Sequence, residues 1–174
     1  TDGGVTFADN IAALSARHPR YAPQIAAWQT WWWEMFSGAI PQTEAAIAEL
    51  HARGVKQYAL SNMSHETVDG TFAMSPAFGL LDGRIISGIE GVMKPGPEIF
   101  QLACARFGFA PSEALFVDDS ARNIEAARAL GFHTHHFTDP SRLRPALVEL
   151  GLLWPGSSPS GEVARSAGGG PLRR

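Results

Sequence analysis

The chain has 174 residues, of which 45% are hydrophobic and 18% charged, a length and balance typical of one globular domain. A net charge of −3 gives no electrostatic basis for binding nucleic acid or an anionic membrane surface. The single cysteine excludes an internal disulfide and favours the cytoplasm, and neither a membrane-spanning apolar run nor a secretory signal pattern is present.

The first elements in chain order are two predicted helices. Residues 7–18 carry apolar side chains at helical spacing, and residues 22–36 continue as a second helix rich in tryptophan. The run Trp31-Trp32-Trp33 favours aromatic packing within this helical pair over a ligand-stacking surface. At least one of these rings must lie off the main apolar face, which leaves aromatic surface to cover a site or a partner.

Helices and strands then alternate along the chain. Further helices are expected at residues 43–53, 64–73, 97–107, 121–130 and 141–150. Strands are expected at residues 55–60, 84–87, 114–117 and 132–137. Alternation over short connections predicts an α/β fold with a doubly wound, mostly parallel sheet covered on both faces. Residues 155–174, rich in Gly, Ser, Pro and Arg, are expected to form a disordered tail.

Three polar signatures follow the predicted strands and turns in one order. Ser61-Asn62 ends an apolar run (YALSN), Lys94-Pro95 opens a predicted helix (MKPGPEIF), and Asp118-Asp119 ends a second apolar run (ALFVDDS). The carboxyl ends of strands in a doubly wound sheet converge on one crevice, which is where ligands bind. A hydroxyl, an ammonium and a carboxylate pair brought together there suit a phosphoryl group and a divalent cation.

The acidic pair is the strongest local signal. Two adjacent carboxylates at the end of a buried strand repel each other, and a dry site raises that cost. A bound Mg²⁺ removes the cost, since Mg²⁺ prefers carboxylate oxygens together with water and substrate phosphate. A role for Asp119 or Ser120 as the cap of the next helix would explain one acid but not both. The pair therefore predicts that Asp118 and Asp119 bind Mg²⁺.

The other two signatures each have an ordinary alternative. Lys94 by itself reads as a solvated surface lysine, and Ser61 with Asn62 reads as a cap for the helix that follows. A hydroxyl and backbone N–H groups at a helix amino terminus also form a phosphate cradle. The order and placement of all three signatures favour the functional interpretation.

In these segments the chain resembles the haloacid dehalogenase-like (HAD) hydrolase superfamily, in its subfamily with a small helical cap. The matching segments are LSN, VMKPGPEIF and LFVDDSARNIEAARALGF, and the resemblance covers roughly residues 1–154. It implies a Rossmann-like HAD core over residues 39–154. Residues 1–38 would then be part of the cap, and residues 155–174 would be the tail.

The resemblance also implies a role for each matching residue. The motif hydroxyl, here Ser61, holds the transferring group, and the motif lysine, here Lys94, balances charge. The motif acids, here Asp118 and Asp119, bind Mg²⁺. The expected catalytic residues are Ser61 and Lys94, and the expected phosphate-binding residues are Ser61, Asn62 and Lys94. The expected metal ligands are Asp118 and Asp119. Asn123 is expected to support the site through a hydrogen bond to one of its residues.

The family's first motif has no counterpart in the sequence. That motif is a strand ending in the aspartate nucleophile, and it precedes the cap. The resemblance therefore indicates a chain that lacks its first few dozen residues and is expected to be inactive as given. Because the missing strand lies centrally in the family's sheet, its two neighbours are expected to be left unpaired.

Within the family, phosphatase and dehalogenase readings compete. The dehalogenases resembled here work without metal and carry small polar residues in place of Asp118-Asp119. The acids therefore favour a Mg²⁺-dependent phosphatase acting on a small-molecule phosphate ester. A 2-haloacid dehalogenase is the alternative, and a non-catalytic remnant that binds a protein partner through its Trp-rich helices is another. Receiver-like signalling domains are disfavoured, because their acids come early in the chain.

Overall fold

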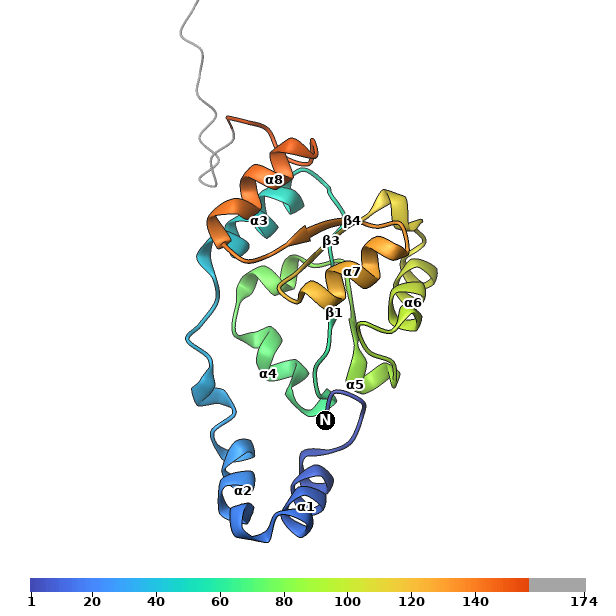
Figure 1. Ribbon diagram of the computed structural model, residues 1–174. Helices are drawn as coiled ribbons and strands as arrows, with labels where there is room; N and C mark the ends of the chain where they lie inside the picture. Colours follow the sequence, from blue (N-terminus) through green and yellow to red (C-terminus); the bar gives the residue numbers. More distant parts are fainter. Residues whose placement is uncertain (157–174) are drawn as a thin grey trace, which may run out of the picture.

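A helical hairpin stands at one end of an α/β core (Figure 1). It consists of α1 (Phe7–Arg17) and α2 (Ala22–Thr30), joined by a 3₁₀ turn at Pro19–Tyr21. The structure is a computed structural model that describes residues 1–156. The predicted disordered tail therefore lies outside the described residues, except for its first two positions.

Four short strands form two separate parallel pairs. β1 (Tyr58–Ser61) pairs with β2 (Gly83–Ile86), and β3 (Leu115–Asp118) pairs with β4 (His133–His136). Within the part of the chain that the structure describes, no pairing joins β1 to β3. The parallel direction confirms the predicted strand arrangement. The break leaves β1 and β3 each paired on one side only.

Helices connect the strands and close the core. They are α3 (Pro41–Ala52), α4 (Val68–Ala73), α5 (Ser87–Glu90), α6 (Pro97–Phe107), α7 (Ala121–Ala129) and α8 (Leu143–Glu149). Shorter 3₁₀ turns lie at Trp33–Met35, His65–Thr67, Pro76–Leu80, Pro111–Glu113 and Pro140–Arg142. Among residues 1–156, none of these helices is long and apolar enough to cross a bilayer.

The apolar core has one cluster on each face of the strands. Phe116 and Leu115 are adjacent on β3, so their side chains point to opposite faces. Phe116 packs in a cluster with α6 and α7, whose members include Ile85, Ile99, Phe100, Ile124 and Ala127. Leu115 packs in a second cluster with α3 and α8, whose members include Ala46, Leu143 and Leu147. Helices therefore cover both faces, as a doubly wound fold requires.

The second helix is shorter than predicted. It ends at Thr30 rather than continuing to residue 36, and Trp32 instead sits among aromatic rings. Its ring centroid lies 5.6 Å from that of Phe7, 5.8 Å from that of Trp28 and 5.7 Å from that of Phe36. The expected aromatic packing within the helical pair is thus present, and these ring contacts favour ending the helix before the tryptophan run.

The hairpin contacts the core through α4 and the turn before it. The Phe7 N–H donates a hydrogen bond to the Glu66 carboxylate. The Trp33 ring lies against Gly70, where a Cβ would come within 2.3 Å of the ring carbon Cη2. This contact explains a glycine in the middle of α4, a position where glycine otherwise weakens a helix.

Two further boundaries differ from the sequence prediction. β1 begins at Tyr58 rather than Val55, because the chain at Gln57 is held by Asp82 through hydrogen bonds of 2.9 and 2.7 Å. The strand expected at residues 84–87 ends at Ile86 as β2, because Ser87 begins the helical turn α5 (Ser87–Glu90), which is capped by Gly91 with a positive φ of 73°.

Candidate active site

The three polar signatures meet between the two strand pairs. Ser61 is the last residue of β1, Asp118 is the last residue of β3, and Lys94 lies in the loop before α6. The Lys94 Nζ donates to the Leu60 carbonyl of β1 at 2.7 Å and to Asp118 Oδ2 at 2.7 Å. One ammonium therefore bridges the ends of two strands that share no backbone hydrogen bond.

The ion pair between Lys94 and Asp118 is buried. Their side chains are 8% and 6% exposed, and the Lys94 ammonium also lies 5.4 Å from the Phe116 ring centroid. A buried ion pair survives when its remaining hydrogen-bonding capacity is satisfied. The Leu60 carbonyl accepts a second hydrogen bond from the Lys94 ammonium.

Asp118 is satisfied on its other oxygen. Its Oδ1 accepts from the Ser120 N–H at 2.8 Å and from Asn123 Nδ2 at 3.0 Å. Burial alone would raise the pKa of the Asp118 carboxyl, but hydrogen bonds from Lys94, Ser120 and Asn123 outweigh burial and hold that pKa below its usual range. The Asp118 carboxylate is thus ionised, and these hydrogen bonds fix its orientation.

Asp119 lies in a different environment from its neighbour. It is exposed, and its backbone carbonyl lies 2.9 Å from His136 Nε2 at the end of β4. Among residues 1–156, no group of three or more His, Cys, Asp and Glu side chains is arranged to hold a metal. Two adjacent carboxylates still fit Mg²⁺, which binds through one or two carboxylates and fills its shell with water and phosphate oxygens.

Asn62 is occupied by the backbone of Lys94. Its Nδ2 donates to the Lys94 carbonyl at 2.8 Å, and its Oδ1 accepts from the Lys94 N–H at 2.9 Å. The peptide bond that follows, Lys94-Pro95, is cis. A contact from Asn62 to phosphate would therefore involve its backbone N–H rather than its side chain.

Ser61 places a side-chain hydroxyl at the carboxyl end of β1. The residue is partly buried at the end of β1, and its side chain makes no hydrogen bond to any other residue that the structure describes. The Ser61 hydroxyl is therefore available for a ligand oxygen at the carboxyl end of β1.

Two residues that sequence reasoning missed hold the loop after Ser61. The buried Ser87 hydroxyl accepts from the Met63 N–H at 3.0 Å, and the Gly88 N–H donates to the Met63 carbonyl at 3.0 Å. A Cβ on Gly88 would lie 2.6 Å from that carbonyl oxygen. A glycine close after a strand, as Gly88 is, signals close backbone approach, whereas Ser87 is expected from the sequence only as the last residue of a strand.

The sequence matches a family model described as haloacid dehalogenase-like hydrolase over residues 24–131, more than half of the chain. The chain belongs to this HAD family. The matched range includes all three polar signatures, so the ion pair between Lys94 and Asp118 lies within it.

Curated relatives of this HAD chain include both phosphatases and dehalogenases. The sesquiterpene phosphatase astK of Aspergillus oryzae is 31% identical over 53% of this chain and 47% of its own length. The (S)-2-haloacid dehalogenase 1 of a Pseudomonas species is 33% identical over 55% and 42%. Phosphoserine phosphatase of Thermus thermophilus is 34% identical over 52% and 37%. The chain thus spans about half or less of these three relatives.

Solved structures support the same fold. A predicted HAD-like family hydrolase from Porphyromonas gingivalis aligns with a TM-score of 0.65 and 25% identity, over 86% of this chain and 75% of that one. A HAD family enzyme of Bacteroides thetaiotaomicron, in complex with magnesium and inorganic phosphate, aligns with a TM-score of 0.62 and 23% identity, over 82% and 76%. Because the identity to the Bacteroides enzyme is only 23%, this match supports the fold and not a shared activity.

Proposed function

We propose that this chain carries the phosphate- and metal-binding part of a Mg²⁺-dependent phosphatase that acts on a small phosphorylated metabolite. The observation that carries the proposal is the acidic pair at the end of β3, with Asp118 fixed against the Lys94 ammonium at 2.7 Å. Phosphatases among the relatives support this reading. A dianionic ester needs cationic partners, and this crevice offers one ammonium and a place for a metal.

Asp118 and Asp119 would hold the Mg²⁺, with water and phosphate oxygens completing its shell. When bound, the ion neutralises charge on the phosphoryl oxygens. Asp118 suits this role because its carboxylate stays ionised and is aimed by Ser120 and Asn123. Asp119 is exposed and so can turn toward the same space.

Ser61 and Lys94 would bind the transferring group. The Ser61 hydroxyl would donate to a phosphoryl oxygen, and the Asn62 backbone N–H would add a second donor. The Lys94 ammonium would offset negative charge as it moves between nucleophile, phosphoryl group and leaving oxygen. Its position is already fixed by Asn62 and Leu60, so little reorganisation is needed during the reaction.

The nucleophile is the remaining part of the site. Among the residues that the structure describes, Asp118 is the carboxylate paired with Lys94, and hydrogen bonds hold both of its oxygens. A carboxylate held in this way is a poor covalent acceptor. We therefore propose that an aspartate outside these residues acts as nucleophile, and that the 174-residue chain alone does not turn over phosphate esters.

The proposed setting is the cytoplasm. The chain has one cysteine, Cys104, which lies in α6. Burial raises the pKa of the Cys104 thiol, so its reactive thiolate form is disfavoured near neutral pH. An inert, unpaired thiol fits a reducing compartment.

A 2-haloacid dehalogenase is the second candidate. It is favoured by two relatives named as (S)-2-haloacid dehalogenases, which are 33% and 30% identical to this chain. Such a reaction would use the crevice without a metal, and the acidic pair would then have no cation to hold. The buried ion pair with Lys94 satisfies Asp118 in either case, so a requirement for Mg²⁺ discriminates between the two reactions.

A turnover assay separates these candidates. An aspartate-bearing strand segment from a phosphatase relative is joined ahead of Thr1, and two products are measured: phosphate from an aryl phosphate, and halide from a 2-haloacid. The proposal predicts phosphate release that needs Mg²⁺ and stops with a chelator. Halide release that continues with the chelator present would replace the phosphatase assignment with the dehalogenase one.

A further inference from the structure

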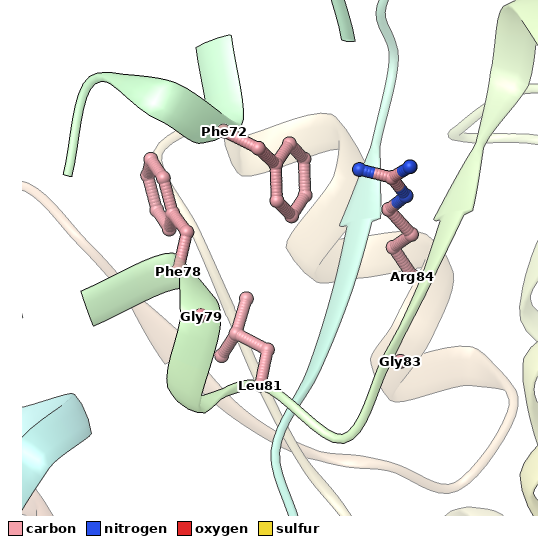
Figure 2. A pocket seen from close by; sticks show the side chains of 6 residues that line it. All are labelled: Phe72, Phe78, Gly79, Leu81, Gly83 and Arg84. Atoms are coloured by element: carbon pink, nitrogen blue, oxygen red, sulfur yellow. The ribbon is translucent and has the colours of Figure 1, made fainter. Parts of the chain in front are cut away.

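A pocket of about 380 Å³ opens between α4, the Pro76–Leu80 turn and the start of β2. Figure 2 shows side chains of Phe72, Phe78, Leu81 and Arg84 arranged around a common space. Gly79 and Gly83 complete the lining, and a Cβ at Gly79 would meet nothing within 4 Å. Its volume is in the range of small-molecule pockets, which are mostly apolar with a few placed polar groups.

The pocket is separate from the candidate active site. It includes Gly83 and Arg84, the first two residues of β2, which pair with Tyr58 and Ala59 at the start of β1. The active-site residue Ser61 is at the opposite, carboxyl end of β1. A ligand in this pocket would therefore occupy the amino ends of the strands, away from the crevice that holds Lys94.

The pocket wall is aromatic. The ring centroids of Phe72 and Phe78 lie 5.3 Å apart, with the ring planes tilted by 43°. Both residues are partly buried, and both line the pocket. Such a wall suits a third aromatic ring, because offset and edge-to-face arrangements of aromatic rings are favourable.

Arg84 places one positive charge at the rim of this wall. Its guanidinium carbon lies 4.8 Å from the Phe72 ring centroid. Its ion-pair partner is Asp69, at 3.6 Å, with an aspartate side chain that is 97% exposed. A long ion pair with a fully solvated carboxylate contributes little. The guanidinium is therefore ready to exchange Asp69 for a carboxylate that also fills the pocket.

We propose that this pocket binds a small aromatic carboxylate, with the ring against Phe72, Phe78 and Leu81 and the carboxylate on Arg84. A planar guanidinium matches a carboxylate through two parallel N–H···O bonds. Arg84 is the one cation among the six lining residues, so a monoanion balances the charge better than a phosphate dianion. This ligand would be distinct from the substrate of the proposed phosphatase.

Binding is tested on the full chain with phenylacetate, followed through the backbone amide NMR signals. Phenylacetate is expected to shift the amides of Gly79, Gly83 and Arg84, while those of Ser61 and Lys94 stay in place. Two matched probes divide the contributions: phenylacetamide keeps the ring without the charge, and acetate keeps the charge without the ring. Both should bind at least about tenfold more weakly than phenylacetate. Equal affinity for phenylacetate and phenylacetamide, or shifts confined to the Ser61 crevice, would overturn the proposal.

Two variants with opposite expected effects complete the test. Arg84→Gln keeps a polar side chain but removes the charge, and should weaken phenylacetate binding about tenfold. Asp69→Asn removes the competing carboxylate, and should strengthen it. Arg106→Gln is the control, because Arg106 is paired with Glu90 on another part of the surface. Unchanged affinity in Arg84→Gln, or weaker binding in Asp69→Asn, would contradict the proposed carboxylate contact.

Discussion

The side chain of Asn62 holds the backbone of Lys94 from both sides, as acceptor to its N–H and donor to its carbonyl, at 2.9 and 2.8 Å. These residues are 32 positions apart in sequence. The clamp fixes the start of the Lys94 side chain, and contacts with Leu60 and Asp118 fix its end. Asn62 is therefore a positioning residue for the ammonium.

Replacing Asn62 with alanine should loosen this loop. Asn62→Ala removes two partly buried hydrogen bonds and leaves the Lys94 N–H and carbonyl without partners, at a cost of about 1–3 kcal/mol in the free energy of unfolding. Urea denaturation measures that cost, and faster amide exchange at Lys94 reports the loosened loop. Asn10→Ala is the control, since the Asn10 side chain makes no hydrogen bond within residues 1–156. Equal losses in both variants would argue against the clamp.

The buried ion pair gives a second prediction. Lys94→Met should destabilise the fold by about 3–5 kcal/mol, because it leaves the Asp118 carboxylate buried without its partner. The double variant Lys94→Met/Asp118→Asn should cost less than the sum of the two single variants, since neither charge is then left alone. Denaturant unfolding of all four proteins measures the coupling. Lys56→Met is the matched control: its pair with Asp82 is exposed and should contribute little. Simple additivity of the single variants would show that the pair is not coupled.

The sequence predicted which residues meet in the site but not how each is used. Ser61, Lys94 and Asp118 follow strands or turns whose ends converge in any parallel sheet, so their meeting could be foreseen. The clamp by Asn62 could not, because it joins a side chain to a backbone 32 residues away and leaves no local pattern. The early end of α2 could not be predicted for a similar reason. The packing of Trp32 on Phe7 is a tertiary contact, and it overrides the helical periodicity of the local sequence.

Asp118 makes stability depend on pH in one direction. Its pKa is lower in the folded chain than the unfolded value of about 3.9. The stability from its ionised form is therefore fully present above that unfolded value and is lost as the pH falls through the lower, folded pKa. Lys94→Met removes a hydrogen bond that lowers the Asp118 pKa against the effect of burial, so this pKa should rise. The loss of stability in acid should then begin at a higher pH. Carbon-detected NMR titration of the Asp118 carboxyl measures its pKa in the parent chain and in Lys94→Met. An unchanged Asp118 pKa in Lys94→Met would contradict this account.

The open edges of β1 and β3 should show in hydrogen exchange. Each strand is paired on one side, and within the described residues no pairing joins the two. Amides in Tyr58–Ser61 and Leu115–Asp118 that face the gap should exchange faster than those of α6, which is bonded along its length. Mass-spectrometric exchange on the monomer measures this difference. Strong, uniform protection of both strands would show that the sheet closes without a further strand.

The most direct test of the proposed function is a Mg²⁺ titration of phosphate release, in the chain joined to an upstream aspartate strand. Asp118→Asn should raise the Mg²⁺ concentration needed for half-maximal rate, because it removes a carboxylate from the metal site. Lys94→Ala should lower kcat about 100-fold at saturating Mg²⁺, in line with loss of one preorganised charge, and leave the Mg²⁺ requirement nearly unchanged. Halide release from a 2-haloacid that ignores Mg²⁺, or an Asp118→Asn enzyme with unaltered Mg²⁺ dependence, would contradict the assignment.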